Sequence, residues 1–303
     1  MKALVTGATG LIGQQLIAHL DEPVVVGRSL DRIRKLLGDV QAYAWPSPTT
    51  ELHPLEAFED VDVIFHLAGE SIANGRWTRD KKIRIEKSRI EGTRNLIHAV
   101  RCVAKNPCSL VSASAIGIYG SQGNNLLTES SAPKHGFLSD LCQKWETEAH
   151  IASQYGVRVV TPRIGIVLDN CGGALRRMLL PFKLGLGGRL GNGLQWMSWI
   201  HIKDLVDLLL HMATSDFEGP VNAVSPQPVT NREFTQCLAK TLGRPAILPT
   251  PKFALQNLFG EFSSVLLNSQ RVSSALAENY GFRFQFDHLD SALNDLLLSK
   301  TTQ

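Results

Sequence analysis

The chain lacks most of the features that assign a sequence to a specialised class of protein. Its five cysteines are an odd number without a CxxC pair, so neither a disulfide framework nor a structural zinc site is expected. Its nine histidines show no HExxH or HxH spacing, which leaves a metal site without support. No apolar run approaches the roughly 18 residues of a membrane span. Basic and acidic side chains nearly balance, at 31 and 28, which disfavours nucleic-acid binding.

These absences predict a soluble, cytoplasmic protein that has no membrane and no nucleic acid among its partners. The first apolar stretch is interrupted by Gly7, Gly10 and Gly13, so no signal peptide is expected. Hydrophobic residues make up 44% of the 303-residue chain, which is enough for a full core in one large domain or two ordinary ones. The sequence thus predicts a globular protein whose partner is a small-molecule substrate.

Short apolar segments alternate with helical patterns in the first half of the chain. The apolar segments cover residues 1–6, 23–27, 61–69, 109–114 and 157–161. The clearest helical patterns run from Ile83 to Val103 and from Asp140 to Tyr155. Such alternation is typical of βαβ units and of a parallel sheet covered on both faces. The predicted fold class is α/β, a Rossmann-type doubly wound parallel sheet with a smaller, mostly helical C-terminal lobe.

The composition changes after about residue 165. Residues 172–193 are rich in glycine and either cover a ligand site or form a flexible surface connection. Beyond them we expect a helix from Asp204, with Asp204 as its N-cap, then a sheet strand over 220–224 and a mainly helical tail. The expected domains are a nucleotide-binding unit of residues 1–165, completed by about 204–225, and a substrate or lid lobe of residues 166–203 and 226–303.

The glycines at the start of the chain carry the strongest functional signal. Gly7, Gly10 and Gly13 form GxxGxxG directly after the first predicted strand and at the start of a helical pattern. In a dinucleotide-binding fold, such glycines permit a tight turn, close approach of the pyrophosphate and packing of helix on strand. Free backbone amides at the helix start then face the phosphates. In this context, the motif predicts a dinucleotide site.

The end of the second apolar segment selects between the two nicotinamide cofactors. A site that prefers NAD places Asp or Glu there, on the ribose hydroxyls. This chain has Arg28 and Ser29 instead, and a guanidinium can bind a 2′-phosphate in bidentate fashion whereas a carboxylate would repel it. We therefore predict NADP(H) rather than NAD(H), with a solvated Arg28 as the alternative.

Two sets of motifs extend along the chain. The first set is Thr6-Gly-Ala-Thr-Gly-Leu-Ile-Gly13, His66-Leu-Ala-Gly69 and Ser112-Ala-Ser114 with Tyr119-Gly120, and it resembles the extended short-chain dehydrogenase/reductase superfamily. The second set includes Pro162-Arg-Ile-Gly-Ile-Val-Leu168, Gly172-Gly-Ala-Leu, 180–188, 196–205 and 219–223, and it resembles the atypical epimerase family branch, of YfcH type. The resemblance covers nearly the whole chain and implies an NADP-binding Rossmann domain with a smaller C-terminal lobe. Superfamily relatives often form dimers, which would allow a homodimer, although Trp145 equally fits packing within its own chain.

The resemblance also implies positions for the cofactor contacts. The implied contacts are Gly7, Gly10, Leu11, Ile12 and Gly13 at the pyrophosphate, Arg28 and Ser29 at the 2′-phosphate, Leu67, Ala68 and Glu70 at the ribose and nicotinamide side, and Ile166 at the nicotinamide. Glu70 departs from the small or apolar residue common in the superfamily. Its carboxylate either accepts from ribose hydroxyls or is an exposed acid of a loop.

One expected catalytic pair is missing. Active members of the superfamily use Ser with Tyr and Lys in YxxxK, because i and i+4 share a helix face and the lysine charge makes the phenol a usable base. None of the four tyrosines here is followed by Lys at i+4. The helix expected to carry the pair has Leu141 with Trp145, or Cys142 with Glu146, at that spacing.

Three residues remain as catalytic candidates. Ser114, or Ser112, matches the superfamily serine, which can bind a carbonyl or hydroxyl but cannot abstract its proton. Cys142 can act as a base only if its pKa is lowered, and a packed position on an amphipathic helix suits it as well. His201 titrates near neutrality and equally fits interdomain packing beside two tryptophans. Tyr119 faces either the nicotinamide or the core. Arg163 and Arg176 pair either with an anionic substrate or with surface carboxylates.

Two functions follow from these residues. The first is an NADP(H)-dependent oxidoreductase or nucleotide-sugar-epimerase-like enzyme that works without the Tyr/Lys pair, on a substrate that the sequence does not name. The second is a catalytically silent NADP(H)-dependent sensor or scaffold. The resemblance links it to cell division, because some relatives are described as cell-division inhibitors. A complete cofactor motif supports the first, and the missing pair supports the second.

Overall fold

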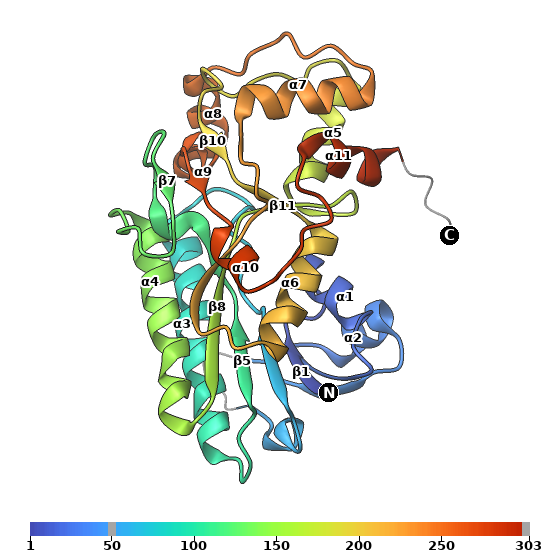
Figure 1. The fold of residues 1–303 in the computed structure, drawn as a ribbon, viewed down its shortest axis with the longest axis vertical. Coiled ribbons are helices and arrows are strands. Elements are labelled where there is room, and N and C mark those ends of the chain that lie inside the picture. The colour runs from blue at the N-terminus through green and yellow to red at the C-terminus, as the bar shows by residue number, and fades with distance from the viewer. Residues whose placement is uncertain (48–52, 299–303) are drawn as a thin grey trace.

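A single parallel sheet organises the first two thirds of the chain in the computed structural model, which describes residues 1–47 and 53–298 (Figure 1). Its strands follow the order β3-β2-β1-β4-β5-β8-β12, with the short β6 beside β8. Every pairing in this sheet is parallel. The strands are β1 (Lys2–Thr6), β2 (Glu22–Gly27), β3 (Gln41–Ala44), β4 (Val63–His66), β5 (Ser109–Ser112), β6 (Ser114–Ala115), β8 (Arg158–Ile164) and β12 (Gly219–Ala223). The predicted doubly wound α/β fold is confirmed.

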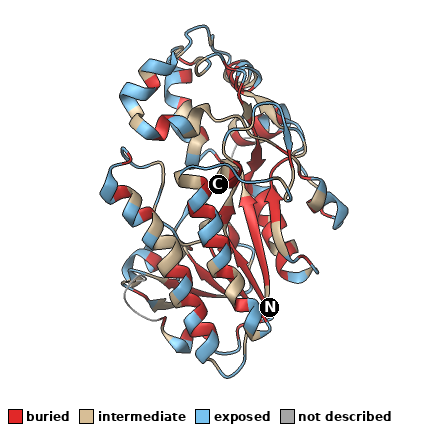
Figure 2. Cartoon of the chain, turned by 90° about the vertical axis from the view of Figure 1, so that its left-hand side faces the viewer, coloured by how far each residue is buried: buried red, intermediate tan, exposed pale blue. Residues whose placement is uncertain are grey.

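Successive residues of a strand point to opposite faces of the sheet. Because those on both faces are apolar here, helices cover both faces. Ala3 and Val5 of β1 pack in one core with α1 (Leu11–Ile17), α2 (Leu30–Leu37) and α6 (Ile202–Thr214). Leu4, between them, packs in a second core with α3 (Arg79–Cys102) and the last turn of α4 (Phe137–His150). Figure 2 shows the strands buried between helices whose outer faces are exposed. Trp145 packs inward, where its Nε1 donates to Thr93 Oγ1 at 3.0 Å.

A mostly helical lobe stands on the carboxyl ends of the strands, at the top of Figure 1. It is built from α5 (Gly173–Lys183), α7 (Asn231–Leu242), α8 (Lys252–Phe259), α9 (Ser263–Leu267) and α11 (Leu289–Leu297). Three two-stranded pairs join it to the sheet, β10 (Trp196–Met197) with β13 (Val229–Thr230), β9 (Ile166–Leu168) with β11 (Trp199–His201), and β7 (Leu126–Leu127) with β14 (Arg271–Val272). The helix α10 (Ala275–Asn279) lies against β12.

The structure excludes one open alternative and contradicts one local prediction. Residues 173–183 of the glycine-rich segment form α5, which excludes the alternative of a flexible connection for them, because glycines occupy only the N-terminal end of the helix and its apolar side chains, such as Leu175 and Leu179, are buried in the core. Asp204 does not cap α6, since its carboxylate accepts from the backbone amides of Gln285 and Phe286 at 2.8 and 3.0 Å. His201 is the N-cap instead, through its Nδ1.

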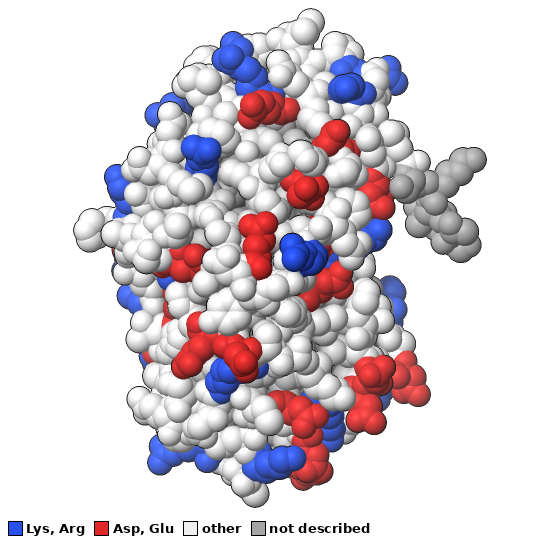
Figure 3. Space-filling view, in the orientation of Figure 1, with Lys and Arg blue, Asp and Glu red and all other residues white. Residues whose placement is uncertain are grey.

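The surface carries both signs of charge. On the face drawn in Figure 3, acidic and basic side chains are interspersed over the sheet and its helices. Within residues 1–47 and 53–298, no helix is both long and apolar enough to cross a membrane.

Candidate functional site

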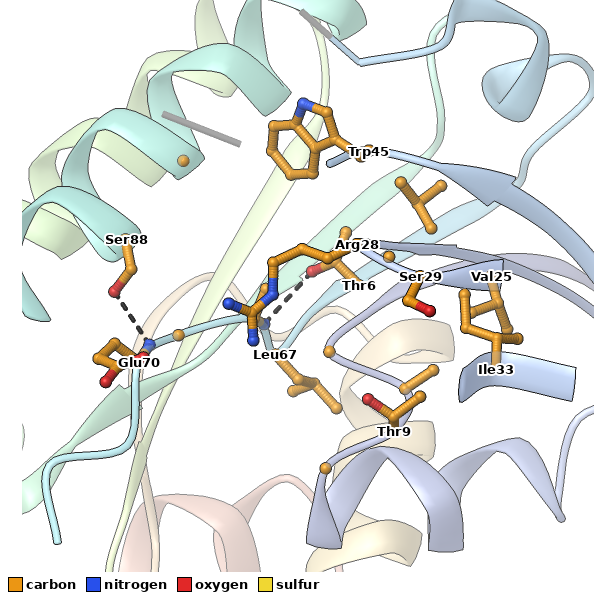
Figure 4. A pocket seen from close by; sticks show the side chains of 18 of the residues that line it. Thr6, Thr9, Val25, Arg28, Ser29, Ile33, Trp45, Leu67, Glu70 and Ser88 are labelled. Carbon is orange, nitrogen blue, oxygen red and sulfur yellow. Dashed lines mark hydrogen bonds between the residues drawn. The ribbon is translucent and has the colours of Figure 1, made fainter. Parts of the chain in front are cut away.

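A cavity of about 690 Å³ opens where the strand order reverses between β1 and β4 (Figure 4). In doubly wound sheets, ligands bind at this switch point, beyond the carboxyl ends of the strands. The cavity is lined by the ends of β1, β2 and β4, the glycine turn and one face of α3. The lining residues are Thr6, Gly7, Ala8, Thr9, Gly10, Val25, Val26, Gly27, Arg28, Ser29, Arg32, Ile33, Trp45, His66, Leu67, Ala68, Gly69, Glu70, Ser71, Asn74, Ser88 and Gly92.

The glycine turn packs closely on its neighbours because two of its positions have no space for a side chain. Gly7 has a φ of +73°, and a Cβ there would lie 2.6 Å from the carbonyl carbon of Leu67. A Cβ on Gly13 would lie 2.5 Å from Gly7 O, so Gly13 allows α1 to pack on the turn. Gly10 begins α1 without a side-chain cap, and no acidic residue follows in its first turn. The backbone amides at this end of α1 are therefore free for an anionic ligand such as a pyrophosphate.

The end of β2 presents a cation and a hydroxyl. Ser29 caps α2 by accepting from the amide of Arg32, and both residues line the cavity. Arg28 extends over the cavity toward the loop that carries Leu67 and Glu70 (Figure 4). No carboxylate among the described residues lines this end of the cavity, so the site fits a ligand with a phosphate beside the ribose.

Glu70 lies on the opposite wall and is already paired. Its Oε1 accepts from Lys81 Nζ at 2.5 Å, and its backbone amide donates to Ser88 Oγ at 3.0 Å (Figure 4). The Lys81 hydrogen bond lowers the pKa of Glu70 despite partial burial, and the charges of Lys81, Arg84 and Arg28 act in the same direction. The carboxylate is thus ionised at neutral pH, and in the described part of the chain Lys81 bonds its Oε1 and leaves Oε2 for a hydroxyl of a ligand.

A polar chain supports the floor of the cavity. Thr6 Oγ1 accepts from the Ala68 amide and lies 2.7 Å from Nδ1 of His66, whose Nε2 lies 3.0 Å from Thr93 Oγ1. Burial, with the charge of Arg89, lowers the pKa of His66 to about 4. This histidine is therefore neutral near physiological pH and fixes the loop after β4 rather than exchanging protons.

The residues that the resemblance implies for the cofactor fall into three groups. Seven line the cavity, namely Gly7, Gly10, Arg28, Ser29, Leu67, Ala68 and Glu70. Leu11, Ile12 and Gly13 lie at the start of α1, next to the cavity, and the Leu11 side chain meets Gly172 at the start of α5. Ile166 lies apart from the cavity walls, half-buried on β9 opposite Trp199.

The superfamily serine position is part of a buried network. Ser114 Oγ donates to Glu146 Oε1 at 2.6 Å, while Ser112 Oγ is buried without a hydrogen-bond partner in the described part of the chain. Arg163 donates to both carboxylate oxygens of Glu146 at 2.9 Å and to the Tyr119 hydroxyl at 2.9 Å. Burial alone would lower the pKa of Arg163, but the hydrogen bonds and charge of Glu146 raise it.

This network settles the surroundings of the two further candidates. Tyr119 is fully buried, donates to Asn222 Oδ1 at 2.6 Å, and has a pKa raised by burial to about 12. Arg163 pairs with a carboxylate of its own chain. Both groups are thus engaged within the core.

Cys142 does not have the lowered pKa that a base would need. Its thiol is buried, and burial, with the charge of Glu146, raises its pKa to about 12. A thiol in such surroundings is a packed core group.

We therefore expect a thiol reagent such as DTNB to leave Cys142 unmodified in the native protein. The exposed Cys102, Cys108 and Cys171 should react, because their thiols are accessible and Cys142 is not. Cys142→Ala should leave the native thiol count unchanged and lower the count in denaturant by one. Modification of Cys142 in the native protein as fast as Cys171 would restore it as a candidate base.

His201 is likewise a poor acid/base candidate. It is fully buried, stacks on Phe286 at 3.9 Å between ring centroids, and has Nε2 at 3.3 Å from Asp295 Oδ2. Burial lowers its pKa to about 4, against the opposing effect of Asp295. Its Nδ1 accepts from the Lys203 amide, so the ring caps α6 and lies away from the residues that line the cavity.

Arg89 lies beside the candidate site and was not expected there from the sequence. Its Nη1 donates to the carbonyls of Glu70 and Ile85 at 3.0 and 3.3 Å, and its guanidinium lies 5.0 Å from the Trp145 ring. Among the described residues, it has no carboxylate partner, and a Cβ on Gly69 would lie 3.1 Å from Nη2. The signal was its place one turn from Ile85 and Gly92, on the inward side of the helical pattern.

Comparisons with known proteins agree with this geometry. Residues 3–224 match the NAD dependent epimerase/dehydratase family, and residues 250–296 match a domain of unknown function (DUF1731). An epimerase family protein of Mycobacterium bovis is 38% identical over 294 residues, which cover 95% of each chain. The crystal structure of the human epimerase family protein SDR39U1 (isoform 2) with NADPH is 32% identical, covers 99% of this chain and 100% of that one, and has a TM-score of 0.88.

A more distant structure shows how far the fold extends. The UDP-glucuronic acid 4-epimerase of Bacillus cereus, crystallised with NAD, is 16% identical, with a TM-score of 0.77 over 97% of this chain and 96% of that one. This likeness is one of fold alone. Because the family match spans nearly three quarters of the chain and the bacterial relative is 38% identical, the chain belongs to the NAD dependent epimerase/dehydratase family.

Proposed function

We propose that the protein is an NADP(H)-dependent, oxidoreductase- or epimerase-like enzyme of YfcH type that works without a Tyr/Lys pair. The observation that carries the proposal is the cavity at the β1/β4 switch point, with Arg28 and Ser29 where an NAD-preferring site has a carboxylate. The NADPH in the crystal structure of the similar human protein supports the same cofactor. NADP(H), when bound, supplies or accepts a hydride.

The chain's own residues would hold the cofactor along the cavity. The amides of the glycine turn would bind the pyrophosphate, and Arg28 and Ser29 the 2′-phosphate. Arg89, beside Gly69, would supply positive charge and hydrogen-bond donors near the ribose of the nicotinamide. These assignments use only side chains or amides that lie at or next to the cavity.

The substrate side would depend on Ser114. A carboxylate only accepts hydrogen bonds, so the Ser114 proton is committed to Glu146 Oε1. Ser114 Oγ therefore offers lone pairs, which suit a hydroxyl group of a substrate better than a carbonyl oxygen.

Titration calorimetry with NADPH and NADH tests the cofactor assignment. We expect NADPH to bind about 10- to 100-fold more tightly than NADH, because a charged hydrogen bond to phosphate contributes about 1.5–3 kcal/mol. Arg28→Ala should remove most of this preference, whereas Arg34→Ala, at an exposed arginine of α2 outside the cavity, should keep it. Equal affinities in the unmodified protein would refute the assignment.

The burial of Cys142 and the engagement of Ser114 keep a second function open, that of a catalytically silent NADP(H)-dependent sensor or scaffold. Stopped-flow absorbance of the NADPH-loaded protein with carbonyl libraries distinguishes the two. Oxidation of NADPH supports the enzyme, whereas a persistent lack of turnover together with a partner that binds only the loaded protein supports the sensor.

A further inference from the structure

Two segments of the lobe contain no acidic residue. Residues 170–202 and 234–260 hold seven basic side chains and neither Asp nor Glu. The whole chain has 31 basic and 28 acidic residues, so the remainder has 24 basic against 28 acidic ones. The two segments thus carry a net positive charge, while the remainder of the protein carries a net negative one. The seven are Arg176, Arg177, Lys183, Arg189, Lys240, Arg244 and Lys252.

The two segments lie side by side. Leu190 and Thr250 form a parallel β-bridge, and the amides of Gly191 and Thr250 donate to Thr250 O and Arg189 O at 2.8 and 2.9 Å. A Cβ on Gly188 would lie 1.7 Å from Leu248 O, so the two backbones touch there as well. The two segments therefore adjoin, and we call the surface of residues 170–202 and 234–260 together the basic pole.

The basic pole also concentrates the exposed apolar side chains. Fifteen large hydrophobic residues of the described chain are exposed, and eight of them belong to these two segments. Ile247 is 78% exposed and Leu186 is 58% exposed, on the two adjoining connections. Single exposed apolar residues are ordinary, whereas a cluster marks an interaction surface. The eight are Leu180, Leu184, Leu186, Leu194, Ile247, Leu248, Phe253 and Leu258.

The positive charges of the pole are not neutralised within the molecule. None of the seven basic side chains forms an ion pair with another described residue. Arg176 and Arg177 donate to uncharged acceptors, among them the carbonyls of Cys171 and Ala73. Glu261, the first acidic residue after the second segment, is held by Lys82. The surface therefore presents both charge and apolar area to an outside partner.

We propose that the basic pole docks the protein on an anionic lipid bilayer. Apolar side chains that protrude between basic ones suit the interface of a membrane, where the apolar groups enter the acyl boundary and the cations meet the headgroups. The acidic remainder would be repelled by the same headgroups and would orient the pole toward the bilayer. The lack of a spanning helix, from which the sequence predicts no membrane partner, does not bear on a surface contact of this kind.

Co-sedimentation with vesicles tests the proposal on the full chain. Vesicles of phosphatidylcholine with about 30 mol% phosphatidylglycerol should bind the protein about tenfold more strongly than pure phosphatidylcholine. This binding should fall by about tenfold at roughly 0.5 M salt, where the charges are screened. Binding that does not depend on phosphatidylglycerol overturns the proposal. A protein that binds soluble polyglutamate but not the anionic vesicles also overturns it, since that result indicates an acidic protein partner.

Matched variants locate the surface. Leu186→Asp combined with Ile247→Asp should weaken binding to the anionic vesicles about tenfold, because it removes apolar area and adds negative charge. Leu36→Asp, at an exposed leucine of α2, makes one change of the same kind outside the pole and should bind as the unmodified protein does. Thermal unfolding and NADPH affinity check that the variants are folded. Equal binding by the pole variant and by Leu36→Asp would overturn the assignment.

Discussion

Replacing Arg163 by methionine is expected to lower the free energy of unfolding by about 3–5 kcal/mol, because it leaves the buried Glu146 carboxylate without its two guanidinium hydrogen bonds. Among the described residues, Ser114 is then the one remaining donor to that carboxylate. The phenol of Tyr119 also loses its donor from Arg163. Equilibrium unfolding in urea measures the loss.

The double variant separates the pair from the packing around it. Replacing Glu146 by glutamine as well removes the uncompensated charge, so Arg163→Met with Glu146→Gln should be less destabilised than the single variant. The surface pair of Lys144 with Glu86 serves as a control, and Lys144→Met should cost no more than about 1 kcal/mol. If the two single changes simply add in the double variant, the buried pair does not contribute as argued.

Most strands of the sheet could be predicted from the apolar segments of the sequence. The five apolar segments became β1, β2, β4, β5 and β8 because strands buried on both faces need nearly every side chain to be apolar. The strand β3 was missed because it lies at the edge of the sheet, where two of its four residues are exposed. The cap of α6 was misassigned because the partners of Asp204 lie about 80 residues further along the chain, and only the tertiary fold brings them there.

In the candidate site too, residues placed by local sequence patterns could be predicted, and residues placed by the tertiary fold could not. Gly7, Arg28 and Ser29 could be predicted because a turn, a strand end and a cofactor are linked by local geometry. Glu146 and Arg89 could not be assigned roles, since their partners come from distant elements and charge in a helical pattern usually indicates a solvated face. For Cys142 and His201, residue type alone suggests an acid/base role. Burial argues against that role, because it raises the pKa of Cys142 and lowers the pKa of His201.

Substituting alanine for Gly7 is expected to abolish NADP(H) binding and to destabilise the fold by about 2–5 kcal/mol. The left-handed backbone, with φ at +73°, costs an L-residue about 1–2 kcal/mol. The new Cβ would lie 2.6–2.7 Å from the backbone of Leu67 and Ala68, and forcing extra volume into a packed site costs about 1–3 kcal/mol more. Relief requires the loop after β4 to move, and that loop is one wall of the cavity. Calorimetry with NADPH and unfolding in urea measure the two effects.

Gly156→Ala is the matched control for this prediction. Gly156 has nearly the same φ, +77°, but a Cβ there meets no atom of the described structure within 4 Å. This variant should therefore lose only the backbone contribution, about 1–2 kcal/mol, and should bind NADPH like the unmodified protein. The difference between the two variants isolates the close approach of β1 and β4 from the cost of the left-handed turn. NADPH binding that survives in Gly7→Ala would mean that the crevice between these strands is not where the cofactor lies.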